Sequence, residues 1–176
     1  ITSPNTRAVT LTSTALIDTG SWSVTIAGVM SGAGGVTKSG SGTLTLSGTN
    51  TYTGVTTITQ GTLSVATIGN GGVAGNLGAA TNAVGNIVLN GGILSYTGST
   101  ASTDRGVTVN VTTNGEIDST TNTLTIATTG ITANGTLTIG GAGNTTISSV
   151  ISGAGGITKT GAGTLTLSGT NTQTVV

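Results

Sequence analysis

The acidic residues are the first side chains in this sequence that could carry out chemistry. There are four of them, Asp18, Asp104, Glu116 and Asp118. Hydrolysis of a glycosidic bond needs two carboxyl groups that flank the sugar, and a β-strand would place Glu116 and Asp118, two positions apart, on one face. Asp18 and Asp118 nevertheless occupy equivalent places in two related segments, and no aromatic platform for a sugar accompanies the acids. We therefore expect the acids to be structural.

Other catalytic and metal-binding chemistry finds few suitable residues. The sequence contains no His and no Cys, so the usual metal ligands and the usual base near neutral pH are missing. Gly140 to Ile147 faintly resembles a calcium-binding nonapeptide, but Thr145 takes the place of the ligand Asp. Gly34 to Ser39 lacks the Gly directly before Lys, and the helix after it, that a phosphate-binding loop needs. We expect no metal, no cofactor and no enzymatic activity.

The basic residues occur in two equivalent pairs. Lys38 and Lys159 occupy the same place in one repeated segment, and Arg7 and Arg105 do so in another. Only 5% of the residues are charged and the formal net charge is zero, so there is no basic surface for nucleic acid. No apolar run approaches the roughly 18 residues of a membrane-spanning helix. We expect the four cations to be solvated on the surface, with no nucleic-acid partner and no membrane insertion.

The elements that must position these residues repeat along the chain. Ser31 to Thr51 returns almost letter for letter as Ser152 to Thr172, at a separation of about 121 positions. A weaker echo links Arg7 to Asp18 with Arg105 to Asp118, at a separation of about 98–100. The difference of roughly 21–23 residues predicts one additional block of structure between Asp118 and Val150.

Short segments in which apolar residues alternate with polar ones recur at similar intervals and are bounded by Gly, Asn or Ser. This pattern predicts short β-strands. The segments are Val9 to Leu11, Val24 to Ile26, Leu44 to Leu46, Thr56 to Ile58, Leu63 to Val65, Ile87 to Leu89, Val107 to Val111, Leu124 to Ile126, Leu137 to Ile139 and Leu165 to Leu167.

A block of about 20 residues is typical of one coil of a solenoid. We therefore predict an all-β fold, a single-stranded parallel β-helix of about eight coils. We expect residues 1–176 to form one continuous solenoid, with a first repeat unit at about 7–65, an irregular loop at about 66–83 and a second unit at about 105–174. Eight side chains are expected to face inward: Val24, Ile26, Leu44, Leu46, Leu137, Ile139, Leu165 and Leu167.

Glycine is expected at the corners between the sides of the solenoid. The runs Gly32 to Gly35 and Gly153 to Gly156 permit the positive φ of a sharp turn. The Asn-Gly pairs that begin at Asn70, Asn90, Asn114 and Asn134 would ordinarily indicate hairpin turns, but in a solenoid they can equally be left-handed corners, so they are not counted as hairpins.

The run from Gly40 to Val65 resembles the passenger-associated transport repeat of bacterial autotransporters. With Ser31 to Ser39 the resemblance covers about 35 residues, and the second copy, Ser152 to Thr172, covers about 20 more. The resemblance implies a bacterial protein that is secreted or lies on the cell surface, with stacked β-helical coils and no catalytic residues.

Two functions remain open. The first is an extracellular structural protein that stacks on itself, head to tail, into a filament or matrix fibre, because no cap is evident at either end of the coils. The alternative is the stalk of an adhesin that displays a loop such as residues 66–83 to an unknown surface or host ligand. For the first function the expected assembly interface consists of Ile1, Thr2, Ser3, Val9, Leu11, Gln173, Thr174, Val175 and Val176. The start at Ile1 fits a mature chain whose leader has been removed.

Overall fold

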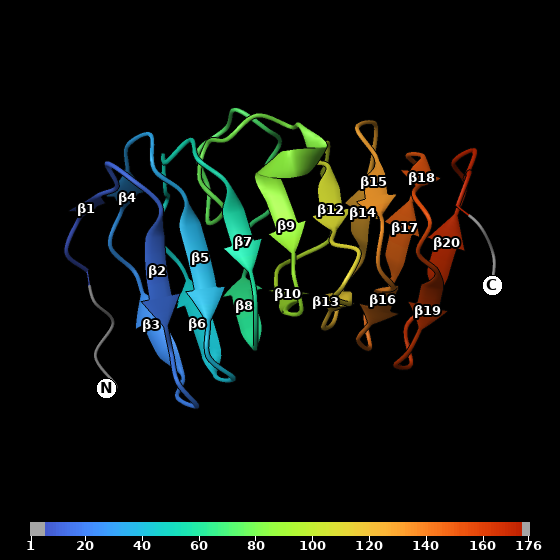
Figure 1. Cartoon of the computed structure of the whole chain (residues 1–176), viewed down its shortest axis with the longest axis horizontal. Helices are drawn as coiled ribbons and strands as arrows, with labels where there is room; N and C mark the ends of the chain where they lie inside the picture. Colours follow the sequence, from blue (N-terminus) through green and yellow to red (C-terminus); the bar gives the residue numbers. More distant parts are fainter. Residues whose placement is uncertain (1–5, 174–176) are drawn as a thin grey trace.

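The computed structural model describes residues 6–173, which form an elongated β-solenoid with β1 (Val9–Thr10) and β20 (Leu165–Leu167) at its two ends (Figure 1). Parallel strands stack into about eight coils, which confirms the predicted fold. In the part of the chain that the structure describes, the one helical segment is the 3-10 helix η1 (Val84–Asn86), and no helix could span a membrane.

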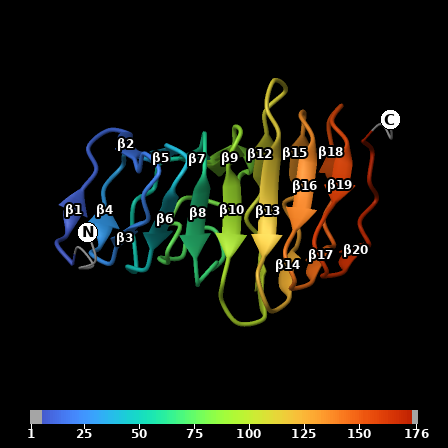
Figure 2. The same ribbon diagram turned by 90° about the horizontal axis from the view of Figure 1, so that it is seen from below.

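Each complete coil has three sides, and successive coils stack strand on strand along each side. Sheet 1 contains seven strands, several of which lie side by side in Figure 2. They are β3 (Val24–Ile26), β6 (Thr43–Leu46), β8 (Thr62–Val65), β10 (Ile93–Tyr96), β13 (Gly115–Ser119), β16 (Leu137–Gly140) and β19 (Ile157–Lys159). Sheet 2 also has seven strands: β2 (Ala15–Asp18), β5 (Val36–Ser39), β7 (Thr56–Ile58), β9 (Ile87–Leu89), β12 (Val107–Val109), β15 (Ile131–Ala133) and β18 (Ile151–Ser152).

The third side is interrupted. Near the N-terminal end it consists of β1 paired with β4 (Met30–Ser31), and near the C-terminal end it is a four-stranded sheet of β11 (Ala101–Thr103), β14 (Leu124–Ile126), β17 (Thr145–Ile147) and β20. Between them, residues 50–53 stack on β4 through main-chain hydrogen bonds, and residues 66–83 contain no strand. Irregular backbone therefore separates the two strand-paired parts of this side.

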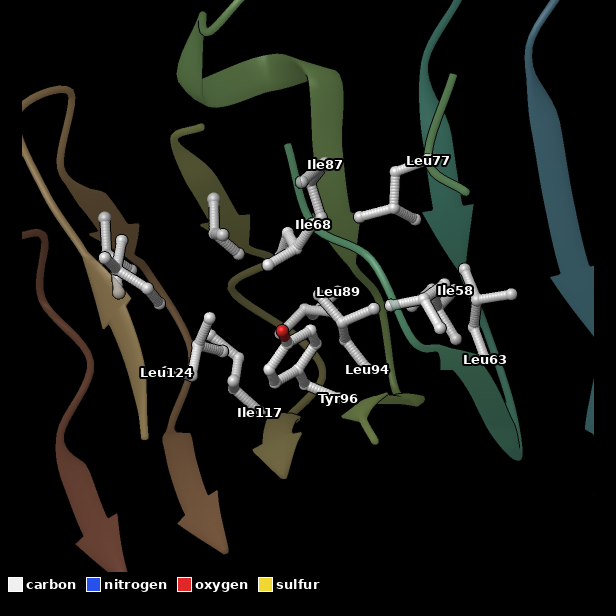
Figure 3. Packing of buried hydrophobic residues seen from close by; sticks show 14 of the residues in the cluster. Ile58, Leu63, Ile68, Leu77, Ile87, Leu89, Leu94, Tyr96, Ile117 and Leu124 are labelled. Carbon is white, nitrogen blue, oxygen red and sulfur yellow. The ribbon is translucent and has the colours of Figure 1, made fainter. Parts of the chain in front are cut away.

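Stacked aliphatic side chains fill the interior. Because every strand pairs in parallel with the next coil, each inward residue lies on the inward residue of its neighbour, as Leu44 does on Leu63 and Leu63 on Leu94. Outward positions form ladders of hydroxyl residues such as Thr45 beside Ser64. Figure 3 shows side chains from all three sides in this interior: Ile58, Leu63, Ile68, Leu77, Ile87, Leu89, Leu94, Tyr96, Ile117 and Leu124.

The coil period is read from the pairing. Val36 pairs with Thr56, 20 positions later, and Ile131 pairs with Ile151, again 20 positions later.

Full burial of an aliphatic side chain contributes about 1.5–3 kcal/mol. A single coil buries few such groups, so each coil depends on its neighbours for stability.

Burial of the predicted inward residues depends on their place along the stack. Four of them in interior coils are fully buried: Leu44, Leu46, Leu137 and Ile139. Val24, Ile26 and Leu165, which lie near the ends, are half-buried. Leu167 faces inward through its pairing with buried Ile147, but it is 40% exposed because no described coil covers β20.

The two copies of the sequence repeat lie on different sides of the solenoid. In the first copy, β5 and β6 belong to sheets 2 and 1, whereas their counterparts β19 and β20 belong to sheet 1 and the third side. The copies are therefore offset by one side. The additional block expected between Asp118 and Val150 includes β14, β15, β16 and β17, and one coil comprises three of these strands.

Glycine makes a close corner possible at Gly32. Gly32 has a φ of 107°, and a Cβ there would lie 2.3 Å from the Leu11 carbonyl oxygen. Among the glycines of the four Asn-Gly pairs, only Gly91 has a positive φ, so the left-handed alternative applies to that pair alone. All the strand pairs are parallel, and the isolated bridge between Asn50 and Gly75 is antiparallel.

Candidate functional site

Lys38 is buried inside the solenoid, which contradicts the prediction of a solvated surface cation. It occupies an inward position of β5 between Ile17 and Ile58, and its exposed fraction is 0%. Its ammonium donates to the carbonyl oxygens of Ser39 (2.7 Å), Gly40 (2.8 Å) and Gln60 (3.1 Å). Burial lowers the pKa of Lys38, and the charge of Asp18 partly opposes this effect.

The side chain reaches the corner at the end of its own strand, where three main-chain carbonyls accept its protons. Two of the three acceptors belong to its own corner, and the third, Gln60, belongs to the next coil. Lys38 therefore ties two successive coils together at the same corner.

Lys159 occupies the corresponding place in the second copy of the repeat and remains exposed, as predicted. It follows Ile139 in an inward column of sheet 1, and its ammonium donates to the carbonyl oxygens of Thr160 and Gly161. These acceptors correspond to Ser39 and Gly40. β19 is the last described strand of sheet 1, so no described coil supplies a counterpart of Gln60.

Arg105 is the second buried cation, and the prediction of a solvated residue is wrong here too. Its exposed fraction is 2%. Nε donates to Gly69 O (2.9 Å), Nη1 to Ala80 O (3.2 Å), and Nη2 to Val73 O (3.2 Å) and Gly78 O (2.8 Å). Burial lowers its pKa, while Tyr52 and Asp104 act in the opposite direction. The guanidinium thus gathers four carbonyls of the segment 66–83. Arg7, its counterpart in the sequence, is exposed.

The segment 66–83 packs against the solenoid through its own side chains as well, in the green region above β7 and β9 in Figure 1. Ile68 and Leu77 are 5% and 2% exposed and point into the interior shown in Figure 3. The Asn76 side chain accepts from the amides of Ala66 and Thr67 and donates to Gly48 O. The outermost residues of the segment, Gly72 to Ala74, are exposed.

Glu116 and Asp118 lie on one outward face of β13, as the two-residue spacing predicted. Burial raises the pKa of Glu116, and the charge of Asp118 raises it further. Asp118 Oδ2 lies 3.5 Å from Ser95 Oγ, and its buried Oδ1 has no hydrogen-bond partner. Among the described residues, no group of three or more acidic, His or Cys side chains could hold a metal ion.

The other two acids are bound to nearby main-chain amides. Asp18 Oδ1 accepts from Gly20 N at 2.8 Å, and Asp104 Oδ1 accepts from Gly71 N at 2.7 Å. Asp104 therefore helps to hold the segment 66–83, next to Arg105. These contacts are structural ones.

Three residues of the expected assembly interface are described, and they lie at opposite ends of the molecule. Val9, in β1, is 40% exposed, whereas Leu11 is only 5% exposed and already packs in the core. Gln173 is half-buried at the other end, with a buried Oε1 that has no hydrogen-bond partner. The remaining predicted residues lie outside the described residues: Ile1, Thr2, Ser3, Thr174, Val175 and Val176.

Two asparagines, which the sequence analysis did not single out, extend the ladder between coils. Asn50 Oδ1 accepts from Met30 N at 2.8 Å, and Asn171 Oδ1 accepts from Ile151 N at 3.0 Å. The two residues are equivalent in the sequence repeat, and each substitutes a side-chain oxygen for a main-chain carbonyl. In the sequence, both could have been found from the tripeptide Gly-Thr-Asn, which ends at Asn50 in the first copy and at Asn171 in the second.

Comparison with known proteins identifies the repeat. Residues 36–65 and 157–174 match the passenger-associated-transport-repeat. The first match contains β5 to β8 and the second contains β19 and β20, and the resemblance seen in the sequence is confirmed. No curated protein and no solved structure matches the chain.

Proposed function

We propose that this chain, which carries two passenger-associated transport repeats, is an extracellular structural protein whose solenoids stack end to end into a filament or matrix fibre. The repeats support an autotransporter-type passenger β-helix, and this family implies secretion or a place at the cell surface. The proposal includes no catalytic activity, cofactor or nucleic-acid partner. The two buried cations bind main-chain carbonyls of the chain itself.

The uncovered strands at the two ends are the observation that carries the proposal. Among the described residues, β20 pairs only with β17 and β1 pairs only with β4. Leu167 in β20 and Val9 in β1 are each 40% exposed. The free N–H and C=O groups of an edge strand are a template for another strand. Both ends therefore offer a parallel edge together with apolar side chains.

A second copy of the chain has the geometry that these edges require. β1 and β20 both lie on the third side, and every coil adds to the next by parallel pairing. β1 of one copy would extend β20 of another, with Val9 over Leu165 and Leu11 over Leu167. Such a head-to-tail contact uses different surfaces on the two partners, so it continues into an open fibre.

The test is a carboxylate placed in the proposed junction. Leu167→Asp would be tolerated in a single solenoid, where the position is 40% exposed, but would be buried without a partner between two stacked copies. Thr166→Asp is the matched control, because Thr166 is exposed on the same strand and paired with the outward Thr146.

Electron microscopy in negative stain and light scattering should show fibres from the wild type and from Thr166→Asp, and isolated rods from Leu167→Asp. Circular dichroism checks that all three chains fold. The proposal fails if the wild-type chain remains monomeric at high concentration, or if Leu167→Asp forms fibres as readily as the control.

The exposed tip of the segment 66–83 favours a second candidate, an adhesin stalk that displays this loop. Val73 is 54% exposed there, although Arg105 binds its carbonyl oxygen. This role would be supported by a ligand that binds isolated rods of the wild type and does not bind the Val73→Asp variant. Isolated rods as the sole native form would favour it over the fibre.

A further inference from the structure

We propose that the Lys159 ammonium binds a main-chain carbonyl oxygen of the second copy that covers the C-terminal end, and so sets the register of the junction. The inference rests on the proposed end-to-end stacking and identifies a residue that would hold the junction together. It starts from the difference between two equivalent lysines, one inside the stack and one at its end.

The contacts of Lys38 define what a complete lysine corner contains. Its ammonium has three protons to donate, and it uses two carbonyls of its own corner, Ser39 and Gly40, and one of the next coil, Gln60. The side chain is 0% exposed when the next coil is in place. The covering coil therefore supplies both the third acceptor and the burial.

Lys159 has the first half of this arrangement. Its ammonium already donates to Thr160 O and Gly161 O, the two acceptors of its own corner. It remains exposed because β19 ends sheet 1 among the described residues. A carbonyl oxygen from a covering coil, in the place that Gln60 O takes above Lys38, would provide the third acceptor.

The occupant we assign is a second copy of this chain, because its coils follow the same three-sided plan. With its β1 placed over β20, the corner that leads into β1 lies over the corner after Lys159, which leads into β20. Neighbouring residues of a strand direct their carbonyls to opposite sides, so a slip of one residue would turn the required carbonyl away and reverse the inward side chains. One positioned ammonium thus favours the correct register.

Amine labelling tests this directly, because the sequence contains only two lysines, Lys38 and Lys159. Acetylation with an N-hydroxysuccinimide ester, read by mass spectrometry, should modify Lys159 in the monomeric Leu167→Asp chain and leave Lys38 unmodified. In wild-type fibres Lys159 should be protected about as well as Lys38. Full reactivity of Lys159 within intact fibres would overturn the inference.

Substitution provides the second measurement. Because a hydrogen bond to a charged group is involved, Lys159→Met should raise the concentration needed for assembly by about tenfold or more and leave the melting temperature of the monomer unchanged. Lys38→Met, the matched control, should instead lower that melting temperature. If the wild type assembles and Lys159→Met assembles at the same concentration, this inference is wrong while the stacking proposal stands; a wild type that never assembles refutes the stacking itself.

Discussion

Replacing Arg105 with Met should release the segment 66–83 while leaving the solenoid folded. The guanidinium bonds to the carbonyls of Gly69, Val73, Gly78 and Ala80, which are spread over twelve positions of a segment that contains no strand. Met retains much of the apolar stem but donates no hydrogen bond. The four carbonyls would then need water or would remain unsatisfied.

The magnitude follows from the number and burial of these bonds. A hydrogen bond to a charged group contributes roughly 1.5–3 kcal/mol, so four could contribute about 6–12 kcal/mol before any compensation. Desolvation of the guanidinium costs several kcal/mol, in the range of about 3–6. The carbonyl of Val73 lies at the exposed tip, where water can replace the lost donor. We therefore expect a net loss of about 3 kcal/mol in the local stability of the segment.

Hydrogen exchange is the appropriate assay, because it reports opening of a segment separately from global unfolding. The amides of Gly72 and Ala79, which donate to Ala80 O and Tyr52 O, should exchange about a hundredfold faster in Arg105→Met. Amides of sheet 1 far from the segment, such as that of Thr138 in β16, should change little.

Arg105→Lys is the control for charge. A lysine restores the cation but cannot span four carbonyls with one ammonium, so it should recover only part of the protection. If Arg105→Met leaves the exchange of Gly72 and Ala79 unchanged, then the other contacts of the segment are sufficient to hold it, and the role assigned to the guanidinium is wrong.

Two further outcomes follow from buried or crowded ionisable groups. Burial raises the pKa of Tyr52 to about 12, so the native state favours the protonated phenol; the associated stability, about 2.7 kcal/mol for two pKa units, should be present below pH 10 and lost as pH rises through about 12. Tyr52→Phe should lower the free energy of unfolding by about 1 kcal/mol at neutral pH, because the hydrogen bond to Thr56 is lost. Urea titrations at pH 8 and pH 11.5 should show that this free energy falls less between the two pH values in the variant than in the wild type. The raised pKa of Glu116 means that its ionisation opposes folding; Glu116→Thr should therefore stabilise the protein at pH 7 by about 0.2–1 kcal/mol, a gain that disappears as pH falls through the carboxyl pKa. Equal melting curves of this variant and the wild type at pH 7, or a gain that persists at pH 3, would contradict the assigned cause.

The fold could be predicted because the repeated pattern is dominated by inward aliphatic side chains. Each alternating segment identified in the sequence falls on a strand, from β1 to β20. Those strands place Leu, Ile or Val at inward positions, and parallel stacking places like residues on like. A period of about 20 residues then leaves few alternatives to a solenoid.

Several of the strands that the pattern missed have a residue other than Leu, Ile or Val at an inward position. In β5 one inward position is Lys38, in β17 one is Thr145, and in β13 one is Gly115. Alternation of hydrophobicity cannot detect such strands, since their burial depends on a neighbouring corner or on a hydroxyl group. The repeat, rather than the local pattern, was the signal for them.

The buried cations were mispredicted for a related reason. A charged residue between polar neighbours is usually solvated, and nothing local distinguishes Lys38 from Lys159. Their environments differ because, among the described residues, a coil covers Lys38 and none covers Lys159. For Arg105 the determining feature is a segment some thirty residues earlier in the chain, whose carbonyls converge only after the solenoid has formed.

The offset between the two copies of the repeat bears on how such a rod can lengthen during evolution. The two strands of the repeat belong to sheets 2 and 1 in the first copy and to sheet 1 and the third side in the second. The same sequence can therefore form different sides of the solenoid. Duplication or loss can then proceed in steps of one strand and its corner, about a third of a coil, without rebuilding the interior. Each such step rotates everything beyond it by one side. The direction in which an outward feature such as the segment 66–83 points can therefore change by duplication alone, at constant core composition.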